Sequence, residues 1–217
     1  MIITIDGPTA SGKSSVAQLL AEKLSYYYLY TGLLYRALAY IRISKAENTE
    51  IKDILTNGSL QYCYTHPKVP QILFNGLDIT SYLKSAEIDR YASILSADPV
   101  VRALLLDFQR KLGVCHSLVA DGRDCGTVVF PHADYKFFLT AHAEVRAARW
   151  QKSQVALNNY FTLEESLSII QERDERDSNR ALAPLIKAPD AHVIDNSNLD
   201  LLGTLNMIVQ YSNGDSV

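Results

Sequence analysis

A glycine-rich segment near the amino terminus, GPTASGKS, carries a lysine and a serine at a spacing that suits phosphate binding. Glycines allow successive backbone N–H groups to face an anion, and a helix starting there adds partial positive charge. Lys13 would reach the outer phosphates of a nucleoside triphosphate, and Ser14 would be a ligand for Mg²⁺. We therefore predict an ATP or GTP site with Mg²⁺. Its residues are Gly7, Pro8, Thr9, Ala10, Ser11, Gly12, Lys13, Ser14 and Ser15.

Two later segments combine arginine with aspartate. In ERDERDSNRALAP, Arg173, Asp177 and Arg180 are spaced i, i+4 and i+7, which places them on one face of a predicted helix. In LVADGRDCGTVVFP, an apolar run leads to Arg123 and Asp124, at the end of a strand where α/β sheets bind ligands. Converging guanidinium groups suit transfer between two phosphorylated substrates. A charged surface that pairs with itself is the alternative.

The elements that would position these residues alternate between strands and helices. A helical pattern follows the glycine-rich turn, with Val16, Leu20 and Leu24 on one side. Helical patterns also separate most of the short apolar runs, an arrangement typical of a parallel sheet with helices on both faces. The predicted strands lie at 1–6, 26–30, 117–121, 135–139 and 191–195.

Three stretches add detail to this alternation. Asn75-Gly76 between two short apolar runs predicts a type I′ hairpin, and hence an inserted antiparallel unit at about 60–90. A helix is expected with Asp98 as N-cap, Pro99 in its first turn and Gly113 beyond its end. The polar stretch 151–162 interrupts two helical patterns, as a mobile lid or an ordinary surface loop would.

Composition narrows the class of protein. The 217 residues carry a net charge of -3, which argues against nucleic-acid binding because that function usually needs a basic face. The three cysteines form no C-x-x-C pair, so neither a disulfide framework nor a zinc site is favoured. No leader pattern and no apolar run long enough to span a bilayer is present, so we expect a cytoplasmic protein without membrane contact.

Four motifs together resemble one family. With GPTASGKSS, TGLLYR, ADGRDCGTVVFP and ERDERDSNRALAPL in that order, the chain resembles bacterial-type cytidylate kinases, which are P-loop nucleoside monophosphate kinases, from Ile3 to about Asp195. The resemblance implies an α/β fold with a five-stranded parallel core, an NMP-binding insert and a lid. It also implies a monomeric enzyme that transfers the γ-phosphoryl group of ATP, with Mg²⁺, to CMP or dCMP.

The resemblance further implies boundaries and residue roles. The core would comprise about 1–35, 100–148 and 175–217, the NMP-binding region about 36–99 and the lid about 149–174. Lys13, Arg123 and Arg180 would be catalytic, and Arg146 and Arg149 would lie on the ATP side. The acceptor site would comprise Thr31 as part of its wall, Arg36, Arg123 and Arg180 at the phosphate, Ser93, Arg102 and Asp124 at cytosine, and Arg173 and Asp177 at the sugar.

The assignment of the base can be checked chemically. Cytosine offers an amino donor at N4 and acceptors at N3 and O2, so Asp124 can accept and Arg102 can donate. Uracil reverses the first two positions and would leave a carboxylate facing a lone pair. Unpaired polar groups in a site can reduce kcat/KM by orders of magnitude, so we predict a preference for CMP over UMP.

Two positions depart from the family pattern. Trp150 stands where the family often has the second of two consecutive arginines, so one cation of the lid is missing, and we expect Trp150 to pack under the lid. Tyr30 stands where the family typically has aspartate in D-[ST]-G. A carboxylate there could order Lys13 or a Mg²⁺-bound water. We therefore hypothesise an active enzyme with a weaker Mg²⁺ dependence on this side.

Two other functions fit part of the pattern. A related kinase could act on UMP or AMP, and Ser93, Arg102 and Asp124 are the positions that would discriminate. A P-loop ATPase or nucleotide switch that binds a protein partner would need a second carboxylate or a water-positioning glutamine. Asp121 supplies only the first carboxylate.

Overall fold

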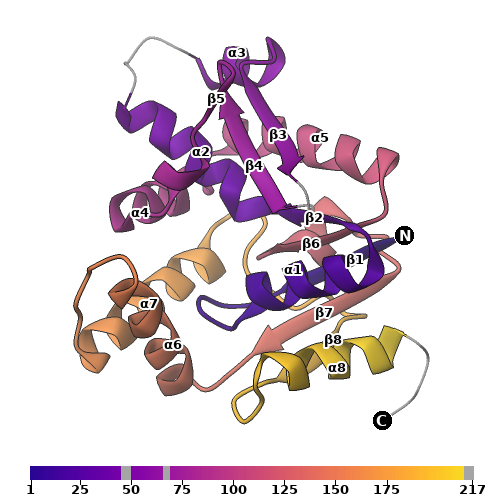
Figure 1. Cartoon of the computed structure of the whole chain (residues 1–217), viewed down its shortest axis with the longest axis vertical. Helices are drawn as coiled ribbons and strands as arrows, with labels where there is room; N and C mark the ends of the chain where they lie inside the picture. Colours follow the sequence, from indigo (N-terminus) through magenta and orange to yellow (C-terminus); the bar gives the residue numbers. More distant parts are fainter. Residues whose placement is uncertain (45–49, 66–68, 213–217) are drawn as a thin grey trace.

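The computed structural model of the chain describes residues 1–44, 50–65 and 69–212. Its centre is a parallel sheet in the order β2-β6-β1-β7-β8 (Figure 1). The five runs predicted as strands are these five strands, so the predicted α/β class is confirmed. The strands are β1 Ile2–Asp6, β2 Tyr27–Tyr30, β6 Leu118–Gly122, β7 Tyr135–Thr140 and β8 His192–Asp195.

The central strands are buried because helices cover both faces of the sheet. Every residue of β6 is buried, as expected for an interior parallel strand. On one face, α1 (Lys13–Leu24) and α8 (Leu201–Ser212) pack on Ile3, Ile5 and Phe137. On the other face, α2 (Thr31–Ser44) and α5 (Pro99–Cys115) pack on residues that include Leu118 and Ala120. No helix within the described ranges is long and apolar enough to cross a membrane.

The inserted unit is a three-stranded antiparallel sheet in the order β3-β4-β5. Asn75 and Gly76 both have positive φ, 50° and 78°, which confirms the two-residue hairpin predicted between β4 and β5. The sequence did not reveal β3, because an Asn-Gly turn points only to the strands on its two sides. Its strands are β3 Leu60–Thr65, β4 Val69–Phe74 and β5 Leu77–Asp78. In the chain, α3 Ile51–Thr56 precedes them, and the short 3₁₀ helix η1 Thr80–Leu83 and α4 Ala86–Leu95 follow them.

Helix α5 begins as predicted and ends later than predicted. Asp98 Oδ1 accepts the backbone N–H groups of Val100 and Val101, so Asp98 is the N-cap. The helix continues to Cys115, and Gly113 therefore lies inside it instead of beyond its end. A β-carbon at Gly113 would lie 2.6 Å from the ring of Phe130. Gly113 thus allows close packing and does not terminate the helix.

Helices α6 (Ala143–Val155) and α7 (Leu163–Asn179) pack against each other beyond the carboxyl end of β7 (Figure 1). Part of the stretch predicted to be irregular is helical, because α6 extends to Val155. Thr162 and Glu165 form a reciprocal capping box at the start of α7. Helix α7 ends before Arg180, which has extended backbone geometry. Arg180 therefore follows the helix and does not share its face with Arg173.

Candidate active site

The predicted phosphate-binding segment is a tight loop between β1 and α1. Gly12 has a φ of 89° and precedes the first residue of α1, so the amino terminus of this helix faces the loop. At Gly7, a β-carbon would lie 2.1 Å from the carbonyl oxygen of Leu139, so only glycine fits against β7. The loop has the form that an anion-binding backbone requires.

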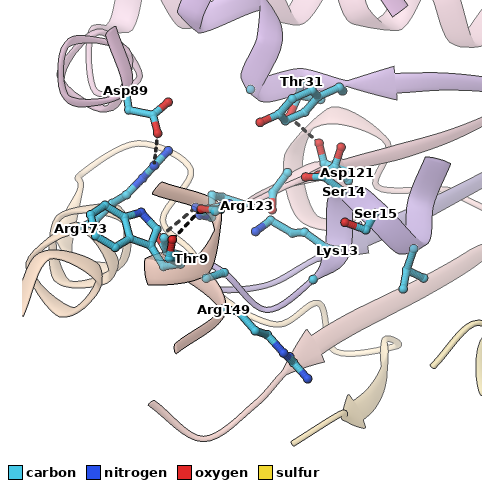
Figure 2. A pocket seen from close by; sticks show the side chains of 18 of the residues that line it. Thr9, Lys13, Ser14, Ser15, Thr31, Asp89, Asp121, Arg123, Arg149 and Arg173 are labelled. Carbon is cyan, nitrogen blue, oxygen red and sulfur yellow. Dashed lines mark hydrogen bonds and ion pairs between the residues drawn. The ribbon is translucent and has the colours of Figure 1, made fainter. Parts of the chain in front are cut away.

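Lys13 and Ser14 are the first residues of α1, and Ser14 lies beside Asp121 of β6 (Figure 2). The Lys13 ammonium donates to the Pro8 carbonyl at 2.9 Å, and burial, together with the charge of Arg123, lowers its pKa. The Ser14 hydroxyl donates to Asp121 Oδ2 at 2.6 Å. Burial raises the pKa of Asp121, although Lys13 and Ser14 oppose this effect. Lys13 therefore lies beside a hydroxyl–carboxylate pair.

Tyr28 completes the arrangement around Asp121. Its hydroxyl, from β2, donates to Asp121 Oδ1 at 2.8 Å, while Ser14 occupies the other carboxylate oxygen. Burial and the neighbouring Asp121 raise the pKa of Tyr28 well above its ordinary value. Tyr28 therefore stays a neutral donor that fixes the orientation of the carboxylate.

A cavity of about 770 Å³ connects this loop with the predicted acceptor residues. Figure 2 shows Lys13 and Asp121 on one side of it, Asp89 and Arg173 on another, and Arg149 apart from both. The predicted site residues that line it are Thr9, Ala10, Gly12, Lys13, Ser14, Ser15, Thr31, Arg36, Ser93, Arg123, Asp124, Arg149, Arg173, Asp177 and Arg180. The predicted site residues that do not line it are Gly7, Pro8, Ser11, Arg102 and Arg146.

Arginines on the acceptor side of the cavity are paired with aspartates. Arg123 Nε donates to Asp177 Oδ2 at 2.8 Å. Burial would lower the pKa of Arg123, but Asp177 and its neighbours raise it. Arg36 Nε donates to Asp89 Oδ1 at 2.5 Å, and Arg173 Nη1 lies 3.5 Å from Asp89 Oδ2. These pairs hold cationic donors from α2, α7 and the end of β6 around one space.

A second cluster contains the residues predicted to contact cytosine. Asp124 forms ion pairs with Arg102 Nη2 and, at 3.3 Å, with Arg180 Nη2. Burial is the main reason that the pKa of Arg180 is lowered. The hydroxyl of Ser93 is buried near the cavity and has no hydrogen-bond partner within 1–44, 50–65 and 69–212. The cluster therefore presents the Asp124 carboxylate, the Arg180 guanidinium and the Ser93 hydroxyl to the cavity, with Arg102 paired to the carboxylate.

Asp6 holds the segment that follows Arg123 and Asp124. Its two carboxylate oxygens accept the backbone N–H groups of Cys125 and Gly126 at 2.9 and 2.7 Å. These residues begin a short π-helix, η2 (Cys125–Val129). Burial raises the pKa of Asp6 to about 6. Asp6 thus fixes the backbone directly after the two predicted ligand-binding side chains.

Arg146 and Arg149 on α6 have different environments. Arg146 Nη1 donates to Asp174 Oδ2 at 2.5 Å and to the Thr9 carbonyl at 2.9 Å, so it joins α6, α7 and the phosphate loop. Arg149 donates to the side-chain and backbone oxygens of Asn196, both at 2.9 Å. Asn196 in turn donates to the Ser11 carbonyl at 3.0 Å. Arg149 and Asn196 therefore connect α6 to the phosphate loop at the end away from Asp89.

Three residues near these clusters make ring contacts or a hydrogen bond. Trp150 packs against Phe161 with ring centroids 5.1 Å apart and also lines the cavity. The Thr31 hydroxyl donates to the Asp121 carbonyl at 2.6 Å and joins α2 to β6. The ring of Tyr30 stacks parallel to Tyr28 with centroids 6.1 Å apart. Tyr30 therefore lies one ring away from the Ser14–Asp121 pair.

Comparison with known sequences identifies the relatives of this chain. The family model described as Cytidylate kinase matches residues 3–214. A protein named cytidylate kinase from Fervidobacterium nodosum is 42% identical over 202 residues, which cover 92% of this chain and 90% of that protein. A cytidylate kinase from Chlamydia muridarum is 39% identical, with 96% of each chain covered. The chain belongs to the cytidylate kinase family.

Solved structures support the fold. A shikimate kinase from Bacteroides thetaiotaomicron matches with a TM-score of 0.50 at 14% identity, over 99% of this chain and 98% of that one. An uncharacterised protein from Eubacterium ventriosum matches with a TM-score of 0.56 at 15% identity, over 98% of each chain. At these identities the likeness concerns the fold alone. The cytidylate kinase family assignment comes from the sequence matches.

Several residues of this cytidylate kinase site were not found by sequence reasoning. The position of Asp121 at the carboxyl end of a predicted strand was a usable signal, but its partnership with Ser14 was not evident. Tyr28 lies in the predicted strand 26–30, and nothing in that run indicates a partner for its hydroxyl. The partners Asp89, Asp174 and Asn196 had no local signal, because each meets its arginine only through the fold.

Proposed function

We propose that this member of the cytidylate kinase family transfers the γ-phosphoryl group of ATP to CMP or dCMP, giving ADP and CDP or dCDP. The main support is that one cavity joins the phosphate loop to the cluster of Asp124, Arg180 and Ser93. A triphosphate and a pyrimidine monophosphate could therefore be held in one space. The family membership supplies the identity of the acceptor.

On the donor side, the loop backbone and Lys13 would hold the phosphates of ATP. The Ser14–Asp121 pair fits a Mg²⁺ site, because a hydroxyl and a carboxylate oxygen are ligands of the kind that this ion prefers. Bound Mg²⁺ would neutralise charge on the phosphates. Bound phosphate anions would favour the charged form of the buried Lys13, which then adds a second positive charge that water does not screen. Arg149 and Asn196 would shape the end of the site nearest the ATP base.

On the acceptor side, Arg36, Arg123 and Arg180 would hold the phosphate of CMP, and Arg173 and Asp177 the sugar. Asp124 would accept from cytosine N4, Arg102 would donate to the acceptors of the base, and Ser93 would complete the contacts. Held in this way, a phosphate oxygen of CMP can attack the γ-phosphorus in line, without a covalent enzyme intermediate. The arginines and Lys13 then stabilise the negative charge that is spread over the transferred group.

The proposed function divides the chain into a core, an NMP-binding region and a lid. The core comprises about 1–35, 100–148 and 175–217, and the NMP-binding region about 36–99. The lid, about 149–174, includes the connection between α6 and α7. Helix α2 crosses the boundary of the NMP-binding region, and α6 and α7 cross the two boundaries of the lid. Any lid movement must therefore bend these helices or carry them whole. Closure would exclude water and so limit hydrolysis of ATP.

A coupled assay of ADP release tests the proposed function. ATP, Mg²⁺ and purified protein are combined with CMP, dCMP, UMP, AMP or no acceptor. We expect rapid ADP release with CMP or dCMP, slower release with UMP and AMP, and little without an acceptor. A P-loop ATPase or switch would release ADP at the same rate with and without CMP, and that result would exclude the kinase assignment.

A further inference from the structure

Asp89 is an acidic residue that faces the proposed site for the acceptor phosphate. It lies on α4, lines the cavity, and has a side chain that is 26% exposed. Its two carboxylate oxygens meet two guanidinium groups from different helices, Arg36 on α2 and Arg173 on α7. Figure 2 shows Asp89 and Arg173 pointing toward one another. The motifs that carry the family resemblance do not include Asp89.

The two arginines that meet Asp89 are ones to which the proposed function assigns substrate. A carboxylate and a phosphate present the same chemistry to a guanidinium group, namely anionic oxygens that accept hydrogen bonds. A phosphate that binds Arg36 must therefore replace Asp89 on that donor or lie close to a like charge. In both cases Asp89 opposes binding of the phosphate.

Arg36 does not depend on Asp89 alone for its position. Its guanidinium carbon lies 5.1 Å from the centroid of the Tyr30 ring, and its Nη1 donates to the Tyr30 hydroxyl. A cation on an aromatic face is stabilised at such distances. Tyr30 therefore keeps Arg36 in the cavity when its carboxylate partner is exchanged.

Arg173 also has hydrogen-bonding capacity left over. Its Nε is buried and has no hydrogen-bond partner in the described part of the chain. Burial, followed by the charge of Arg123, lowers the pKa of Arg173, although Asp89 counteracts this. A single 3.5 Å contact with Asp89 leaves this guanidinium group ready for a second anion.

We propose that Asp89 is an internal competitor of the acceptor phosphate, which weakens CMP binding and speeds release of the phosphorylated product. This inference rests on the proposed function, because it requires that the phosphate of a nucleotide binds Arg36. Asp89 acts on the phosphate and not on the base. Its effect should therefore be confined to acceptor nucleotides, whose 5′-phosphate would bind Arg36.

The test measures the affinity of Asp89→Asn for CMP, cytidine and ATP by isothermal titration calorimetry. The substitution keeps the shape of the side chain and removes its charge. We expect CMP to bind about 5- to 20-fold more tightly, while the affinities for cytidine and ATP change less than about twofold. Asp89→Glu keeps the negative charge, so this variant should bind CMP with an affinity near that of the unaltered protein.

Glu87→Gln is the matched control, because Glu87 is an exposed acid on the same helix and does not line the cavity. It should leave all three affinities unchanged. Weaker or unchanged CMP binding in a folded Asp89→Asn protein would overturn the proposal, and so would equal tightening of CMP and cytidine. If the unaltered protein binds no CMP, the proposed function fails and this inference fails with it.

Discussion

Replacing Asp124 with asparagine tests the recognition of the base most directly. Asp124 is only 8% exposed and forms ion pairs with Arg102 and Arg180. In the proposed complex, its carboxylate accepts a hydrogen from cytosine N4. Asparagine has nearly the same size but carries one acceptor oxygen and an NH₂ group, which can face the O4 oxygen of uracil. The substitution therefore exchanges an acceptor for a donor without opening a cavity.

The size of the effect follows from the kind of hydrogen bond that is lost. A hydrogen bond to a charged group contributes about 1.5–3 kcal/mol, which corresponds to roughly 10- to 100-fold in kcat/KM. Removal of the charge also leaves Arg102 and Arg180 without their carboxylate partner. That disturbance lowers kcat/KM for both nucleotides, so recognition of the base is judged from the ratio of their kcat/KM values. We expect this ratio to fall by at least about tenfold.

The assay compares kcat/KM for CMP and UMP by ADP release. Asp98→Asn is a suitable control, because Asp98 caps the helix that carries Arg102 and asparagine caps about equally well. This control should leave the ratio and the melting temperature unchanged. A ratio that changes by less than about twofold in a folded Asp124→Asn protein would show that Asp124 does not recognise the base.

Three further predictions concern groups near the phosphate loop. Tyr28→Phe removes a donor to the buried Asp121 and should lower the melting temperature by about 3–6 °C, measured by calorimetry; an unchanged value contradicts the role of Tyr28. Because burial raises the pKa of Asp6 to about 6, its contribution to the free energy of unfolding should fall by roughly 3 kcal/mol as the pH rises from about 3.5 to 7. Urea titrations of the protein and of Asp6→Asn would show this difference, whereas parallel pH profiles would refute it. Tyr30→Asp should lower the Mg²⁺ concentration for half-maximal rate, and no change in a folded protein would mean that Tyr30 serves packing and Arg36 only.

The parts of the structure that depend on local sequence could be predicted. Each central strand is a short apolar run, and the hairpin at Asn75-Gly76 needs positive φ at both residues, so its own sequence specifies it. The phosphate loop is local in the same way. Prediction was wrong at Gly113, where glycine was taken as a helix end. There, the ring of Phe130, from a distant segment, decides which residue fits.

The partners of the functional side chains could not be predicted, because the pairs form between distant segments. Arg173 and Asp89 are 84 positions apart, and Tyr28 and Asp121 are 93 apart. Periodicity places a residue on one face of its own helix or strand, but it carries no information on which faces meet. The sequence indicated that arginines gather at the site, whereas the structure shows the partner of each, which is a carboxylate for most of them and Asn196 for Arg149.

The exposure of these carboxylates distinguishes two uses of an arginine–aspartate pair. The side chain of Asp177 is 6% exposed and that of Asp124 is 11% exposed, compared with 26% for Asp89. Separating a deeply buried pair leaves an uncompensated charge and is costly, so Asp177 and Asp124 should stay with their arginines and take part in binding as fixed acceptors. Asp89 is closer to solvent, so its charge can be rehydrated when a phosphate takes its place. Exchange of one anion for another would then bring CMP to Arg36 without leaving the guanidinium group unpaired.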